Sequence, residues 1–92
     1  MNEEYLLEEM DDLEKLLRRV DSLHLSLDDL DNELDCLHLE RTTVQATFGL
    51  ERSIRILLQT IENIARREYA EVQQKYTNLV SQRKNSEEKP DG

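Results

Sequence analysis

The sequence contains little that interrupts a helix and little that could build a disulfide scaffold. Its 92 residues include two Gly, one Pro, one Cys, three Tyr, one Phe and no Trp. Gly and Pro punctuate strands and turns, so their scarcity argues against a β-rich or loop-rich fold. The single cysteine, Cys36, excludes a framework of internal disulfides. What remains is rich in Leu, Glu, Asp and Arg, a composition typical of long helices.

Long apolar runs are also missing. The longest is Ile56-Leu57-Leu58, far short of the ~18 residues that a membrane-spanning helix needs. The N-terminus, Met1-Asn2-Glu3-Glu4, is acidic and lacks the apolar segment of a secretion signal. We therefore predict an intracellular protein, cytoplasmic or nuclear, with no membrane insertion.

Acidic residues outnumber basic ones, and the excess lies in the first half. The formal net charge is -9; residues 1–40 hold 14 acids and three bases, whereas residues 41–92 hold seven acids and nine bases. A net negative chain lacks the long-range attraction to phosphate that nucleic-acid binding requires. The sequence therefore predicts no nucleic-acid partner, and an acidic arm beside a slightly basic arm suits an antiparallel hairpin.

A heptad pattern runs through the first half of the chain. Apolar residues occupy eleven of the thirteen positions reached by alternating steps of three and four. These positions are Leu6, Glu9, Leu13, Leu16, Val20, Leu23, Leu27, Leu30, Leu34, Leu37, Arg41, Val44 and Phe48. A 3.5-residue repeat kept over this length predicts a coiled-coil seam rather than an ordinary amphipathic stripe.

A second apolar series follows with a less strict period. It runs through Leu50, Ile54, Leu57, Ile61, Ala65, Tyr69, Val72, Tyr76 and Leu79. A mean spacing near that of the α-helix predicts a second amphipathic helix.

The two series predict an all-α protein whose helices form an antiparallel hairpin or coiled coil and associate into a bundle. We expect a single helical domain over residues 1–82, with helices at 4–41 and 50–82 and a polar, disordered tail at 83–92. Three Thr and Gly49 make 42–49 the weakest helical stretch, so we place a turn or kink there. Two alternatives are one continuous coiled-coil helix and a three-helix bundle with a further break at 21–29.

The chain offers few residues for chemistry. His24, Asp28, Asp31, Asp35 and His38 lie along one helical stripe, which raises the hypothesis of a metal-binding helical bundle. The two histidines are 14 residues apart, about 21 Å along a helix, and cannot share one ion. Cys36 has no base placed to activate it. We expect no enzyme activity, no catalytic residue, no metal and no cofactor.

The patterns favour a non-enzymatic coiled-coil subunit that joins a larger cytoskeletal, chromosomal or trafficking complex by helix packing. Its partners would be other helical proteins or further copies of itself. The expected interaction residues are Leu13, Leu16, Val20, Leu23, Leu27, Leu30, Leu34, Leu37, Val44, Phe48, Ile54, Leu57, Ile61, Val72, Tyr76 and Leu79. One alternative is a regulatory adaptor or inhibitor that presents a single amphipathic helix to a groove on a folded target.

Overall fold

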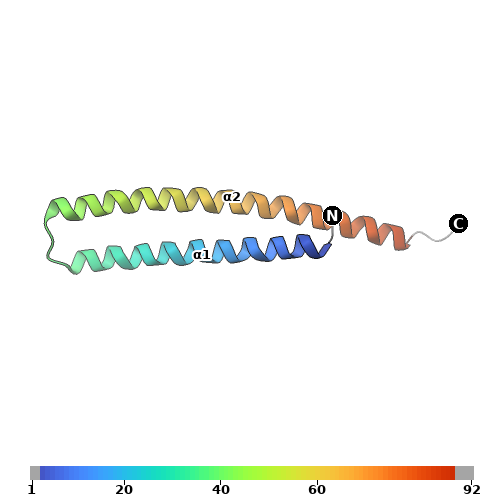
Figure 1. The fold of residues 1–92 in the computed structure, drawn as a ribbon, viewed down its shortest axis with the longest axis horizontal. Helices are drawn as coiled ribbons and strands as arrows, with labels where there is room; N and C mark the ends of the chain where they lie inside the picture. The colour runs from blue at the N-terminus through green and yellow to red at the C-terminus, as the bar shows by residue number, and fades with distance from the viewer. Residues whose placement is uncertain (1–2, 89–92) are drawn as a thin grey trace.

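The chain is a long antiparallel pair of helices. The computed structural model describes residues 3–88, in which α1 (Glu3–Cys36) and α2 (Arg41–Glu88) are joined by a short turn (Figure 1). Residues 3–88 contain no strand. The molecule measures 80 × 16 × 14 Å, and its radius of gyration of 21.7 Å far exceeds the ~12 Å of a compact domain of this length. The predicted all-α helical hairpin is confirmed.

Helix α1 is continuous through the segment where a three-helix bundle would need a break. Two acids, Glu3 and Glu4, occupy its first turn, where the helix dipole favours negative charge. The hydroxyls of Ser22 and Ser26 donate to the carbonyls of residues four positions earlier, each at 3.1 Å. These hydroxyls are therefore satisfied within the helix rather than capping a new one. The single-rod and three-helix alternatives are both wrong.

The turn lies at residues 37–40, earlier than the predicted segment 42–49. The Glu40 carbonyl accepts the first α2 hydrogen bond, from Val44 N at 3.1 Å. Gly49 lies inside α2, and the Thr47 hydroxyl donates to the Thr43 carbonyl at 2.8 Å. Thr costs a few tenths of a kcal/mol in a helix and Gly about 1 kcal/mol. That cost is too small to end a helix whose later residues pack against a partner.

Helix α2 also continues past its predicted end at residue 82. It reaches Glu88, so the first part of the predicted disordered tail is helical. Arg83 Nη1 lies 2.7 Å from Glu3 Oε2, which ties this part of α2 to the start of α1. The rest of that tail, residues 89–92, lies outside the described residues.

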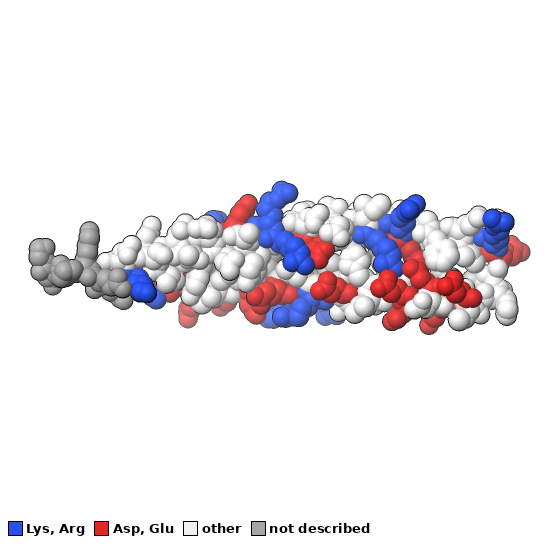
Figure 2. Space-filling view, turned by 180° about the vertical axis from the view of Figure 1, so that it is seen from behind, with Lys and Arg blue, Asp and Glu red and all other residues white. Residues whose placement is uncertain are grey.

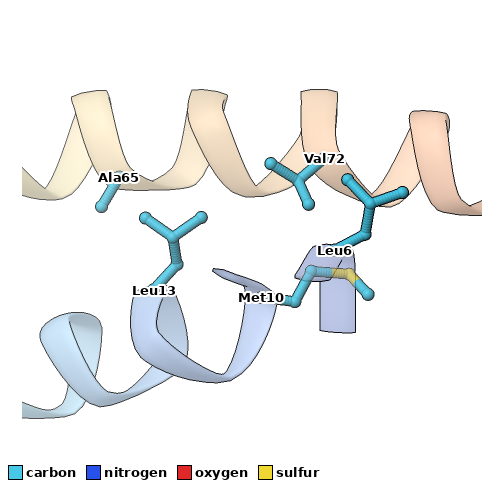
Figure 3. Close-up of a cluster of buried hydrophobic side chains, with 5 residues drawn as sticks. All are labelled: Leu6, Met10, Leu13, Ala65 and Val72. Carbon is cyan, nitrogen blue, oxygen red and sulfur yellow. The ribbon is translucent and has the colours of Figure 1, made fainter. Parts of the chain in front are cut away.

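An apolar cluster joins the helices at the end far from the turn. Its buried members are Leu6, Met10 and Leu13 of α1 with Ala65 and Val72 of α2 (Figure 3). Further side chains pack around it: Leu17, Tyr69, Tyr76 and Leu79. Here the observed line of contact between α1 and α2, called the seam below, matches the predicted apolar series of the second helix.

Truncating the cluster should destabilise the hairpin. Leu13→Ala removes buried methyl groups and should cost about 2–5 kcal/mol. The matched control is Leu25→Ala on the outer surface of α1, where the Leu25 side chain is 64% exposed; it should change stability by less than ~0.5 kcal/mol. Urea unfolding followed by circular dichroism at one chain concentration measures both. Equal losses in the two variants would contradict the assigned core.

Candidate protein-interaction surface

Near the turn, α2 presents a mostly polar line of side chains to α1 instead of its predicted apolar series. The side chains along the seam are those of Glu51, Arg55, Leu58 and Glu62, all buried or half-buried. Each of these four residues directly follows a member of the predicted apolar series. Those members lie outside the seam: Leu50, Ile54, Leu57 and Ile61. A step of one residue turns a side chain about 100° around the helix, so the predicted series points sideways.

Arg55 anchors the polar part of the seam. Its Nη2 donates to Asp28 Oδ1 at 2.9 Å and to Asp31 Oδ2 at 3.0 Å. The hydrogen bond that Arg55 donates to Asp28, together with the attraction of both carboxylates, raises the pKa of Arg55 above its ordinary value. One α2 guanidinium thus bridges two successive turns of α1 and fixes the level at which the helices pair.

Glu51 sits beside this ion-pair layer and is only 4% exposed. A protonated Glu51 can donate a hydrogen bond to the Asp31 carboxyl, and this bond, burial and repulsion from Asp31 all raise the pKa of Glu51 above its ordinary value of 4.5. One oxygen of each carboxyl, Glu51 Oε1 and Asp31 Oδ1, is buried without a hydrogen-bond partner. The pair therefore favours a shared proton over two full negative charges.

The apolar series displaced from the seam forms an exposed stripe on α2. A parallel stripe consists of leucines seven residues apart, three on α1 and Leu37 directly after its end. We call the two stripes together the apolar face; its members are Leu16, Leu23, Leu30, Leu37, Leu50, Ile54, Leu57, Ile61 and Ile64, all exposed.

A groove shows that the two stripes lie on the same side of the hairpin. It has a volume of about 330 Å³ and is lined by residues of both helices. The lining residues are Leu23, Ser26, Leu27, Leu30, Ile54 and Leu58. The apolar face is therefore one surface formed by both helices, with a groove between them.

The other side of the seam is charged. Glu14 accepts a hydrogen bond from the Tyr69 hydroxyl at 2.9 Å. Arg66 Nη2 lies 2.9 Å from Glu62 Oε1, and this hydrogen bond lowers the pKa of Glu62. Figure 2 shows acidic side chains gathered along α1 with basic side chains over α2. The hairpin is thus amphipathic as a whole, with one charged side and one apolar side near the turn.

The sixteen predicted interaction residues divide between the seam and the surface. Four are buried in the hairpin: Leu13, Val20, Leu34 and Val72. Four are half-buried: Leu27, Val44, Tyr76 and Leu79. Eight are exposed: Leu16, Leu23, Leu30, Leu37, Phe48, Ile54, Leu57 and Ile61. The single predicted seam of α1 therefore splits, with alternate members facing α2 and facing outward.

Sequence reasoning missed two groups of residues. Leu50 belongs to the second apolar series but not to the predicted interaction residues, and Ile64 belongs to neither; both are part of the apolar face. The seam residues Glu51 and Arg55 were not singled out at all. The available signal is a spacing of seven residues, which continues the line of Val72, Ala65 and Leu58 back to Glu51. The same spacing continues the line of Tyr76, Tyr69 and Glu62 back to Arg55.

The chain exposes more surface than a compact protein of its size. Its accessible surface is 7475 Å², whereas a monomer of 10.9 kDa is expected to expose about 5,600 Å². Soluble monomers rarely leave a contiguous apolar patch of more than a few hundred Å² uncovered. The apolar face is the part of this surface that would gain most from a partner.

Other kinds of site find no geometric support in the described part of the chain. Within residues 3–88, no three His, Cys, Asp or Glu side chains gather as a metal site requires. His24 is half-buried, while His38 and Cys36 are exposed near the turn. Neither α1 nor α2 has a stretch both long and apolar enough to span a bilayer. Comparisons with protein-family models, with curated proteins and with solved structures found no match to this chain.

The pKa of Glu51 is raised and that of Glu62 is lowered, so the two residues should make stability depend on pH in opposite directions. The raised pKa of Glu51 favours folding below pH 4.5 and opposes it as pH rises through that pKa. Glu51→Gln should therefore raise Tm at pH 7, by an amount that shrinks as pH falls toward 4.5.

Glu62→Gln is the matched control. Because its pKa is lowered, Glu62 favours folding above 4.5 and loses that effect as pH falls through the lowered value. This variant should lower Tm at pH 7 and match the parent chain in acid. Thermal unfolding by circular dichroism between pH 3 and 8 measures both, and a lower Tm for Glu51→Gln at neutral pH would refute the carboxyl pair.

Proposed function

We propose that this chain is a non-enzymatic coiled-coil subunit that assembles with helical partners by packing them onto its apolar face. The observation that supports this is the exposure of nine Leu and Ile side chains at heptad-like spacing on one side of the hairpin. Such a surface offers dispersion contacts and apolar burial, but no nucleophile, acid or base for chemistry. Its function is therefore association within a larger complex inside the cell.

The pattern of the apolar face specifies a helix as its ligand. Leu23 and Leu30 are seven residues apart, as are Leu50, Leu57 and Ile64. Side chains at this repeat form the holes that accept knobs from a second helix packed nearly parallel or antiparallel to the first. Since both helices contribute, the binding surface requires the intact hairpin rather than a peptide of one helix.

Charge restricts which helices can bind. The acidic side chains of α1, including Asp28 and Glu14, lie beside the seam on the side away from Leu30 and Leu16. They repel acidic chains that approach the charged side, while the apolar face stays accessible. Repulsion of wrong partners contributes specificity without adding affinity.

Photo-crosslinking in cells tests this proposal. A photo-reactive amino acid replacing exposed Leu30 should capture a helical protein, identified by mass spectrometry as this chain or another. The same amino acid replacing Leu25, exposed on the outer surface of α1, is the control and should capture little. A second matched pair is Leu57 against Ile56, which are equally exposed at 62%. Equal capture at test and control positions, or none at any, would refute the proposal.

A further inference from the structure

On the basis of the proposed function, we propose that the apolar face binds a second copy of this chain, packed antiparallel. The two hairpins then form a four-helix bundle with their turns at opposite ends, α1 beside the partner's α1 and α2 beside the partner's α2. The argument rests on the spacing, charge and level of the side chains on this face.

The leucine stripe of α1 matches its own reverse. Leu16, Leu23, Leu30 and Leu37 are symmetric about the midpoint between residues 26 and 27. Two copies of α1 running antiparallel about that point place Leu23 opposite Leu30, and Leu16 opposite Leu37, the first residue of the turn. Each exposed leucine thereby meets another leucine.

The polar residues beside this stripe are complementary under the same operation. Arg19, Ser26 and Glu33 are spaced by seven, so they lie in one line next to the leucines. The antiparallel pairing sets Arg19 of each copy opposite Glu33 of the other. The small Ser26 of one copy lies opposite Ser26 of the other at the two-fold axis. Arg19 and Glu33 are both exposed and form no ion pair within residues 3–88.

The stripe of α2 has its centre at the same level. It is symmetric about Leu57, which sets Leu50 opposite Ile64 in an antiparallel pair. Across the seam, residues in contact have numbers that add to between 83 and 86, as for Asp28 with Arg55 and Glu14 with Tyr69. The residue numbers of the two stripe centres, 26–27 and 57, add to a value in the same range, so the two centres lie at the same level along the hairpin. One two-fold axis therefore serves both helices.

The opposite orientation, with both turns at one end, matches these lines poorly. It would bring α1 against the partner's α2 and set the line of Arg19, Ser26 and Glu33 against Ile64, Leu57 and Leu50. Charged side chains would then lie on apolar ones without partners. In the antiparallel bundle the polar line meets the polar line and the apolar line meets the apolar line.

The amount of surface agrees with a dimer. The chain exposes 7475 Å², which is about 1,900 Å² more than a compact monomer of its mass. A stable interface takes about 800 Å² from each partner. The charged side of each hairpin points outward in this arrangement, which keeps most of the acidic side chains of the two copies apart.

Light scattering on the purified full-length chain tests self-association. The expected mass is twice the chain mass of 10.9 kDa. Leu30→Asp and Ile54→Asp should each give the mass of one chain while keeping their helical circular dichroism. The matched controls Leu25→Asp and Ile56→Asp should stay dimeric. A wild-type monomer at high concentration, or a dimer that survives both face variants, would overturn the proposal.

Crosslinking and distance measurements test the orientation in a Cys36→Ser background. Ser26→Cys should form a disulfide-linked dimer readily, whereas Ser22→Cys, displaced along α1, should not. Spin labels on Thr77→Cys should lie about 60 Å apart in the antiparallel bundle, from 1.5 Å of rise per residue on either side of the axis. A distance below about 30 Å would show the turns at one end and overturn the orientation.

The two proposals can fail separately. A folded monomer in solution, together with capture of a different helical protein through position 30 in cells, would reject the second copy and keep the association function. Equal behaviour of the Leu30 and Leu25 variants in both experiments would reject both proposals.

Discussion

The register between α1 and α2 decides which side chains of this chain are covered. Two helices in contact over their whole length touch through positions that recur every 3.5 residues. Once Ala65 and Val72 lie against α1, the same line on α2 runs back through Leu58 to Glu51. The helix cannot bring Leu57 to α1 as well, because adjacent residues point about 100° apart. The polar interior near the turn therefore follows from apolar packing at the other end.

The ion-pair layer near the turn fixes that register more than it stabilises the fold. Removing carboxylates from water costs free energy that the attraction to a nearby cation offsets only in part. Arg55 reaches two acids, while Glu51 and Asp31 each keep one buried oxygen without a partner. Sliding α2 by one turn would take Arg55 away from at least one of the two acids, Asp28 or Asp31, that it now bridges. The layer makes other registers costly without making this one strongly favourable.

The heptad of the first helix predicted much of the fold, since Leu13, Val20 and Leu34 are buried against α2 as a coiled-coil seam requires. Two features could not be predicted from local pattern. The turn at residues 37–40 depends on how far the helices pair, and pairing outweighs the weak helix propensity of Thr43 and Gly49. The exposure of Ile54 and Leu57 depends on the direction of the seam. An apolar period indicates which side chains need covering, but the tertiary register decides what covers them.

A hairpin of two helices has one seam, whereas an apolar band wider than a coiled-coil seam needs two neighbouring helices to cover it. In α1 this band includes Leu27, which is half-buried, and Leu23 and Leu30, which are exposed on one side of it. Turning α1 to bring Leu23 and Leu30 against α2 would move the buried Leu13 and Val20 away from it. Additional helices would cover the same band without moving α1 or α2. The exposed side of the seam is thus a geometric consequence of an apolar band that is wider than the contact between two helices, and this is the ground on which we propose association with further helices.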